Sequence, residues 1–128
     1  MSSQVPADLK YAKSHEWVRI NGDTATVGIT DHAQHELTDV VFVELPAVGR
    51  VVKAGEACAV VESVKTASDI YSPVSGTITA VNAAVVDDPS QVNSAPYGNG
   101  WFYQLKLSQP TEATSLLTPA DYSTQIGA

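Results

Sequence analysis

Cysteine and long apolar runs are the scarcest features of this sequence. Cys58 is the one cysteine among 128 residues, which excludes an internal disulfide framework and a cysteine-based metal site. Its apolar surroundings, residues 57–61, predict a small buried side chain. No apolar run approaches the length of a membrane span, and the first ten residues show neither a secretory signal nor an arginine-rich transit pattern. We therefore expect a cytoplasmic protein of bacterial type, with no membrane partner.

Positive charge is also scarce. Lysine and arginine total 7 against 14 aspartate and glutamate residues, and the formal net charge is −7. This sign disfavours binding to nucleic acid or to anionic membranes, which attract basic proteins. Apolar residues make up 44% and charged residues 16% of the chain, a balance that predicts one folded domain spanning residues 1–128.

The common catalytic motifs are missing as well. The sequence has no glycine-rich phosphate loop and no Gly-x-Ser-x-Gly nucleophile turn. His32 and His35 lie three residues apart and could share a metal ion, but no cysteine or further histidine stands near them in the sequence, which disfavours zinc. These absences predict a chain that is not an enzyme in its own right.

The clearest local signal is a hairpin. Asn21-Gly22 separates two β-prone runs, residues 15–20 and 24–29, and Asn-Gly readily adopts the positive φ angles of a tight turn. The second run alternates polar and apolar residues, as a strand with one buried face does. We therefore predict an antiparallel hairpin at this place.

The other expected elements are short. Thr30 is placed to cap a helix that ends near Leu37. Thr118 and Pro119 predict the start of a C-terminal helix, within a helical tail of about residues 112–126, and residues 1–9 read as a loose lead-in. Strands are expected over residues 39–45 and 101–107, and a turn or a single helical turn within residues 82–93.

Lys65 lies midway between two further β-prone runs. The first ends at Val61 and the second begins at Ile70, so the lysine is predicted to lie at a hairpin tip with its amine in solvent. Glu62 and Asp69 flank it on either side. A solvated turn lysine is the ordinary interpretation, and attachment of a swinging cofactor arm is the functional one.

A faint internal repeat surrounds this hairpin. Residues 49–55 align with residues 76–82 at an offset of 27. In both copies a glycine is predicted to open a turn, and the last residue, Gly55 or Asn82, tolerates left-handed backbone. Two related half-motifs predict a quasi-two-fold sandwich with Lys65 near its axis, although chance similarity of two turn segments gives the same pattern.

Residues 62–76 resemble the lipoyl-attachment motif of the glycine cleavage system H-protein family. Lipoyl domains of 2-oxo-acid dehydrogenases have Asp before the lysine, and biotin carriers have Met on both sides, where this chain has Val64 and Thr66. The resemblance covers about residues 9–123. Thr38 departs from the usual glycine, and the C-terminal helix is less charged than is usual. Further similar segments are residues 10–18, 28–34, 41–46, 88–89, 92–93, 96–98 and 100–101.

The resemblance implies a mainly β fold, the lipoyl/biotinyl-type barrel-sandwich hybrid with a few short helices including a C-terminal one. It also implies lipoate attached to Lys65 and a monomeric carrier in glycine catabolism. Its partners would be a pyridoxal-phosphate-dependent glycine decarboxylase, a tetrahydrofolate-dependent aminomethyltransferase, dihydrolipoamide dehydrogenase and a lipoate-attaching enzyme. Ser14, Glu16 and Asp69 are the candidates for docking the loaded arm, and Glu62 for its recognition. Glu16 as an ordinary strand-edge charge is the alternative.

Three other functions stay open at this point. The chain could be a relay that donates its lipoate to other enzymes, which uses the same attachment chemistry. It could be a small β interaction module with an unmodified Lys65. It could also be an enzyme, which the missing catalytic motifs disfavour.

Overall fold

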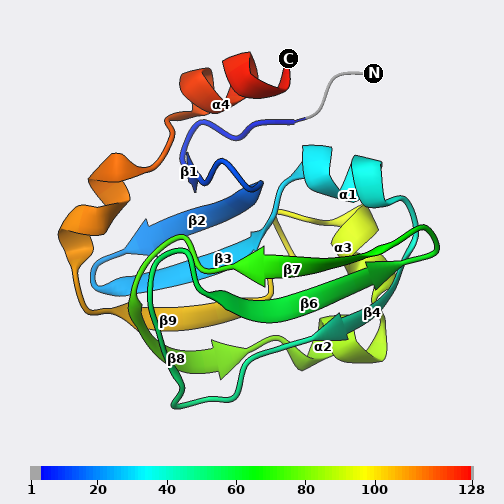
Figure 1. Cartoon of the computed structure of the whole chain (residues 1–128), viewed down its shortest axis with the longest axis horizontal. Helices are drawn as coiled ribbons and strands as arrows, with labels where there is room; N and C mark the ends of the chain where they lie inside the picture. Colours follow the sequence, from blue (N-terminus) through cyan, green and yellow to red (C-terminus); the bar gives the residue numbers. More distant parts are fainter. Residues whose placement is uncertain (1–3, 128) are drawn as a thin grey trace.

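The computed structural model describes residues 4–127 and places two antiparallel sheets face to face (Figure 1). The six-stranded sheet has the order β1-β2-β3-β9-β8-β5 and the three-stranded sheet the order β4-β6-β7. The strands of the two sheets are β1 (Lys10–Tyr11), β2 (Glu16–Asn21), β3 (Thr24–Ile29), β4 (Val40–Glu44), β5 (Val51–Val52), β6 (Ala57–Ser63), β7 (Ala67–Tyr71), β8 (Gly76–Val81) and β9 (Tyr103–Leu107). The helices are α1 (Asp31–Leu37), α2 (Ala83–Asp87), α3 (Ser90–Ser94), α4 (Pro119–Ile126) and a 3-10 helix, η1 (Pro110–Ser115). The predicted mainly β fold with short helices is confirmed.

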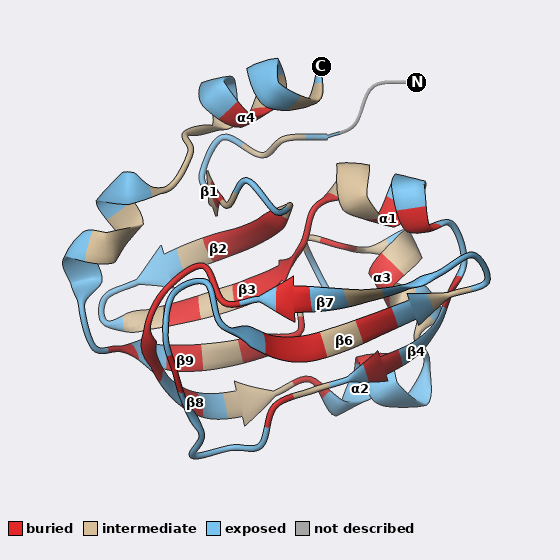
Figure 2. Ribbon diagram, viewed as in Figure 1, coloured by how far each residue is buried: buried red, intermediate tan, exposed pale blue. Residues whose placement is uncertain are grey.

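The core lies between the two sheets. Val43, Val61 and Ile70 of the small sheet join Val27 and Leu105 of the large one in a single buried cluster. Figure 2 shows the buried residues along the inner strands and the exposed ones at the hairpin tips. Burial of alternate side chains on both inner faces is what holds a two-sheet sandwich together.

The hairpin predicted around Asn21-Gly22 is formed by β2 and β3. Gly22 has φ 64°, the left-handed conformation that the Asn-Gly pair favours. Farther along β3, Gly28 packs against the indole of Trp17, and a Cβ at this position would lie 2.7 Å from the ring. A small residue is therefore required where the two strands enter the core.

Both predicted helix caps are confirmed. The Thr30 side chain accepts a hydrogen bond from the Ala33 amide at the start of α1, and the Thr118 side chain accepts one from Asp121 at the start of α4. Each bond satisfies an amide that the helix itself leaves without a partner. None of the helices within residues 4–127 is long and apolar enough to cross a membrane.

The two ends of the described chain pack together, and Figure 1 shows α4 beside the segment that leads into β1. Tyr122 of α4 stacks on Tyr11 of β1, with ring centroids 4.7 Å apart, and Tyr11 and Leu117 form an isolated β-bridge. Within the predicted lead-in, Leu9 is 2% exposed and belongs to the same small cluster. Residues 1–3 lie outside the described residues.

Two local predictions were wrong, and a conformation that one residue tolerates is not used. Residues 82–93 form two short helices instead of one turn, because Asn82 caps α2 and Pro89 starts α3 without continuing α2. Asn82 has φ −94°, so it is not left-handed as Gly55 is. Gly76 opens no turn: it lies in β8, where a Cβ would be 2.1 Å from the Lys106 carbonyl oxygen. The glycine is needed for close packing of β8 on β9.

Candidate functional site

Lys65 lies at the tip of the β6–β7 hairpin, as predicted. The three-residue loop is closed by a bond from the Ser63 amide to the Thr66 carbonyl, 2.8 Å. The Ser63 hydroxyl oxygen accepts from the amides of Lys65 (3.1 Å) and Thr66 (3.2 Å). The Val64 amide also donates to the carbonyl of Asp39, just ahead of β4, at 3.0 Å. The loop backbone is thus tied down while the Lys65 side chain is exposed.

The Lys65 amine is directed toward α1. Its Nζ donates to the carbonyl of Glu36 in the last turn of that helix, at 3.2 Å. Carbonyl groups at a helix C-terminus carry partial negative charge, which suits a cation. Any group carried on this amine therefore starts beside α1.

A cavity of about 260 Å³ opens between α1, the β6–β7 hairpin and the turn ahead of β2. Its wall combines aliphatic side chains from the sandwich with hydroxyl, imidazole and carboxylate groups at the rim. The lining residues are Ser14, His15, Ile29, Ala33, Glu36, Leu37, Val61, Thr66, Ser68, Asp69 and Ile70. Such a surface can hold the apolar part of an extended group and the polar or charged end of it at the same time.

The structure brings three of the predicted site residues to one place. Lys65 borders the cavity through its neighbour Thr66 and its contact with Glu36, and Ser14 and Asp69 line the cavity. Glu62 is exposed on β6 and is not among the lining residues. Its carboxylate is therefore placed for contact with a molecule that approaches the hairpin from outside, and not for contact with a group inside the cavity.

Glu16 lies behind Ser14 and is only 1% exposed, so it is not a solvated charge at a strand edge. Its carboxylate accepts a hydrogen bond from the Ser14 hydroxyl and another from the Tyr71 amide at the end of β7, 3.2 Å. Burial raises the pKa of this carboxyl to about 7, against the lowering effect of these two bonds. Glu16 therefore joins the Ser14 turn to the lysine-bearing hairpin from beneath.

The histidines are arranged differently from the sequence-based expectation. His35 pairs with Asp31, 3.6 Å, and His32 pairs with Glu36, 3.2 Å. The ring that lies next to His32 is that of His15, with centroids 4.9 Å apart. Sequence reasoning missed His15 because it comes from a turn ahead of β2 that is far from α1 in the chain. Glu36 was also missed, although its position four residues after His32 on the same helix was a signal that could have found it.

The comparisons with known proteins agree over almost the whole length. Residues 9–127 match the family model described as glycine cleavage H-protein. The chain is 56% identical to a glycine cleavage system H protein from Opitutus terrae, over 98% of this chain and 99% of that protein. It is 58% identical to one from Escherichia coli, over 95% of each chain. The crystal structure of a glycine cleavage system H protein from Mycobacterium marinum is 45% identical, with a TM-score of 0.90, and covers 97% of this chain and 100% of that one.

The chain belongs to the glycine cleavage H-protein family. The matched residues include the β6–β7 hairpin, α1 and the Ser14 turn. All residues that line the cavity therefore lie within the part of the chain that matches the family. The resemblance seen in the sequence is thereby confirmed. The matched range also contains Lys65, which the structure places on a braced loop beside the cavity.

Proposed function

We propose that this chain is the lipoyl carrier of glycine cleavage, with lipoate joined to Lys65 as an amide. The observation that carries the proposal is the exposed amine of Lys65 on a braced hairpin tip, next to a cavity of about 260 Å³ in a member of the H-protein family. When bound, lipoate would supply a dithiolane that accepts the aminomethyl group of glycine and, once that group has left, a dithiol that thiol–disulfide exchange returns to the disulfide. The chain itself is a carrier and not a catalyst.

The hairpin suits this task because its backbone does not have to move. Lysine plus lipoyl chain reaches on the order of 14 Å from ordinary bond lengths, enough to enter a partner's active site while the domain stays outside. Ser63 and the Asp39 carbonyl fix the loop, so the motion is confined to the arm. Amide formation removes the positive charge of Lys65, and its N–H can still donate to a carbonyl.

The partners follow from the chemistry of the arm. They are a pyridoxal-phosphate-dependent glycine decarboxylase that loads it, an aminomethyltransferase that passes the one-carbon unit to tetrahydrofolate, and dihydrolipoamide dehydrogenase that reoxidises it. A lipoate-attaching enzyme must first recognise the loop, where exposed Glu62 lies three residues before Lys65.

Between partners, the cavity shelters the cationic amine of the loaded arm from water. Asp69 supplies a carboxylate and Ser14 a hydroxyl at its rim, and Ile29, Leu37 and Ile70 supply apolar wall. Asp69 is exposed at this rim, and a hydrogen bond from an ammonium group to its carboxylate is charge-assisted and therefore stronger than one between neutral groups. Glu16 does not line the cavity, and its carboxylate positions the Ser14 hydroxyl by accepting a hydrogen bond from it.

Intact mass tests the attachment. The wild type expressed with lipoate and its ligase is expected to gain the mass of one lipoyl group. Lys65→Arg is expected to gain none. Lys53→Arg, which changes another exposed lysine, is expected to gain one lipoyl group like the wild type. No increment on the wild type would end both the carrier and the relay interpretations. In the same preparation, Asp69→Asn is expected to speed loss of ammonia from the loaded protein, and Asp87→Asn, at an exposed aspartate outside the cavity, is the matched control. Equal rates would remove Asp69 from the docking role.

A further inference from the structure

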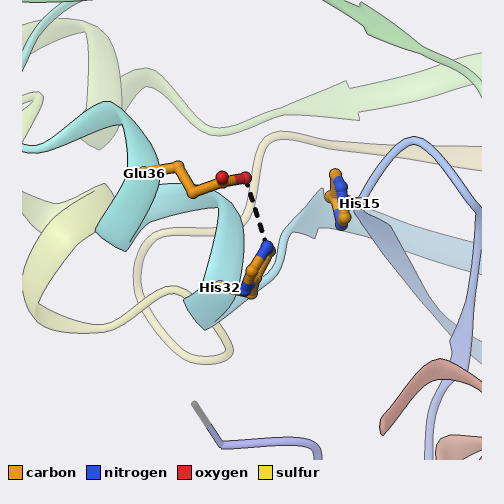
Figure 3. Close-up of side chains that lie close together, drawn as sticks. All are labelled: His15, His32 and Glu36. Carbon is orange, nitrogen blue, oxygen red and sulfur yellow. Dashed lines mark ion pairs between the residues drawn. The ribbon is translucent and has the colours of Figure 1, made fainter. Parts of the chain in front are cut away.

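We propose that His15, His32 and Glu36 form a binding site for a divalent transition-metal ion of the zinc class at the rim of the arm cavity. Figure 3 shows the three side chains together, two from α1 and one from the turn ahead of β2. One ligand atom from each lies within 4.8 Å of the other two. His15 and Glu36 also line the cavity. The site does not depend on the proposed function, because it needs no modified lysine.

The spacing is close to what a metal ion requires. Tetrahedral zinc with bonds of about 2.0–2.1 Å keeps its ligand atoms roughly 3.4 Å apart. His32 Nε2 and Glu36 Oε1 are already 3.2 Å apart. The remaining contraction toward His15 is within reach of side-chain rotation, because the Glu36 side chain is 64% exposed and can adjust at little cost. Two imidazoles and one carboxylate are a ligand set that zinc uses in proteins, with a fourth position left open.

His15 is held for this role by groups behind it. Its Nδ1 lies 2.8 Å from the hydroxyl of Tyr122, which lies 2.7 Å from the hydroxyl of Thr30. When Nδ1–H donates to Tyr122 and Tyr122 donates to Thr30, the Nε2 of His15 is left with a free lone pair. A hydrogen bond on the second ring nitrogen is the usual support of a metal-binding histidine. Tyr122 is fully buried and stacked on Tyr11, so the support is rigid.

The backbone also places the three side chains without the metal. His32 and Glu36 stand four residues apart and therefore share one face of α1. His15 has φ 78°, an uncommon conformation for a residue other than glycine. Two backbone hydrogen bonds fix it, each 3.0 Å long. The His15 amide donates to the Ala12 carbonyl, and the Thr30 amide donates to the His15 carbonyl. The turn that requires this conformation is the one that places the imidazole over α1.

The ligand types favour a borderline transition-metal ion, and the surrounding charges decide how strongly a cation is attracted. Imidazole ligands select zinc, copper or nickel over magnesium or calcium, which prefer oxygen. Asp69 on the cavity wall and the net charge of −7 attract cations, while the Lys65 amine, bonded to the Glu36 carbonyl, opposes them. The open fourth position lies at the cavity rim, so a bound ion would compete with any group that occupies the cavity.

Titration calorimetry of the full chain without lipoate tests the site, with zinc chloride in a non-chelating buffer. We expect one zinc ion per chain. His32→Gln and Glu36→Gln are each expected to weaken binding by about tenfold or more, as loss of a supporting or direct ligand does. His35→Gln, on the same helix but outside the group of three, is the matched control and is expected to stay within about twofold of the wild type.

Two further variants keep the result interpretable. His15→Asn removes the ring and retains a residue that tolerates positive φ, and Tyr122→Phe retains the stacked ring and removes only the hydroxyl. Both should remain folded by circular dichroism, and Tyr122→Phe should weaken zinc binding by about tenfold. Cobalt(II) added in place of zinc should give the intense visible bands of a tetrahedral site in the wild type and in His35→Gln, and should not give them in His15→Asn or His32→Gln. The proposal would be overturned if His35→Gln lost zinc binding while His32→Gln kept it. It would also be overturned if the wild type showed no saturable binding.

Discussion

The two long hairpins of this fold resemble each other in outline and differ in what surrounds their tips. Both β2–β3 and β6–β7 are antiparallel pairs with exposed tips. At the β2–β3 tip a Cβ built on Gly22 would meet nothing within 4 Å. At the β6–β7 tip the amine of Lys65 meets α1 and the rim of a cavity. An exposed tip becomes a site only where another element faces it.

The two tips are also closed by different means. The β2–β3 turn relies on backbone conformation, through the positive φ of Gly22. The β6–β7 loop has no residue with positive φ and is held by the Ser63 side chain and by the carbonyl of Asp39. A side-chain brace leaves positions 64–66 free of the glycine or asparagine that a tight turn demands. That freedom is what allows a lysine to stand at the centre of the loop.

Moving the lysine from one tip to the other is the strongest way to break this comparison. In the double variant Asp23→Lys with Lys65→Arg, an exposed hairpin lysine is present, but it faces no cavity. If the proposed function holds, we expect the lipoyl increment to be lost completely, because the attaching enzyme would have to recognise the β6–β7 loop and Glu62 as well as the amine. Intact mass after expression with lipoate and ligase is the measurement. A full increment on the double variant would mean that tip exposure alone is sufficient.

The features that could be predicted from the sequence are those that depend on near neighbours. The Lys65 hairpin follows from two β-prone runs on either side of it, and the Thr30 and Thr118 caps follow from the residues directly after them. Each of these is a local preference that the fold did not override.

The features that could not be predicted depend on distant partners. Gly76 was read as a turn glycine, but the Lys106 carbonyl, which arrives from β9, is what excludes a side chain there. Glu16 read equally well as a surface charge, and the Tyr71 amide that makes its burial possible is 55 residues away. His15 and Glu36 meet through the packing of a turn against α1. No spacing rule within one segment reports such contacts.

Glu16 links the two hairpins, from the start of β2 to the end of β7, and its titration should be visible in stability. The folded-state pKa of about 7 lies above the ordinary 4.5, so the folded state holds this proton more tightly than the unfolded chain does. The stability that this group contributes is full below pH 4.5, falls as the pH rises toward 7 and is lost above that pH.

Comparison with Glu16→Gln isolates this effect because glutamine does not titrate. Its amide oxygen can still accept from the Tyr71 amide, and its NH2 group can donate to the Ser14 hydroxyl, which reverses the direction of that bond. From pH 5 to pH 8 the free energy of unfolding of the wild type should fall relative to the variant by on the order of 2–3 kcal/mol. Urea unfolding at a series of pH values measures it, and all other titrating groups cancel in the difference. A constant difference across the range would show that Glu16 ionises normally despite its burial.

The smallest expected effect tests the brace itself. Ser63→Ala removes the oxygen that accepts from the Lys65 and Thr66 amides, and should lower the free energy of unfolding by about 1 kcal/mol, because the bonds are exposed. The sharper measurement is hydrogen exchange of these two amides, which should become faster while the Thr24 amide at the other tip does not change. Ser63→Thr keeps the hydroxyl and should restore slow exchange. If Ala and Thr variants exchange alike, the bond from the Val64 amide to the Asp39 carbonyl is enough to hold the loop, and the side-chain brace is dispensable.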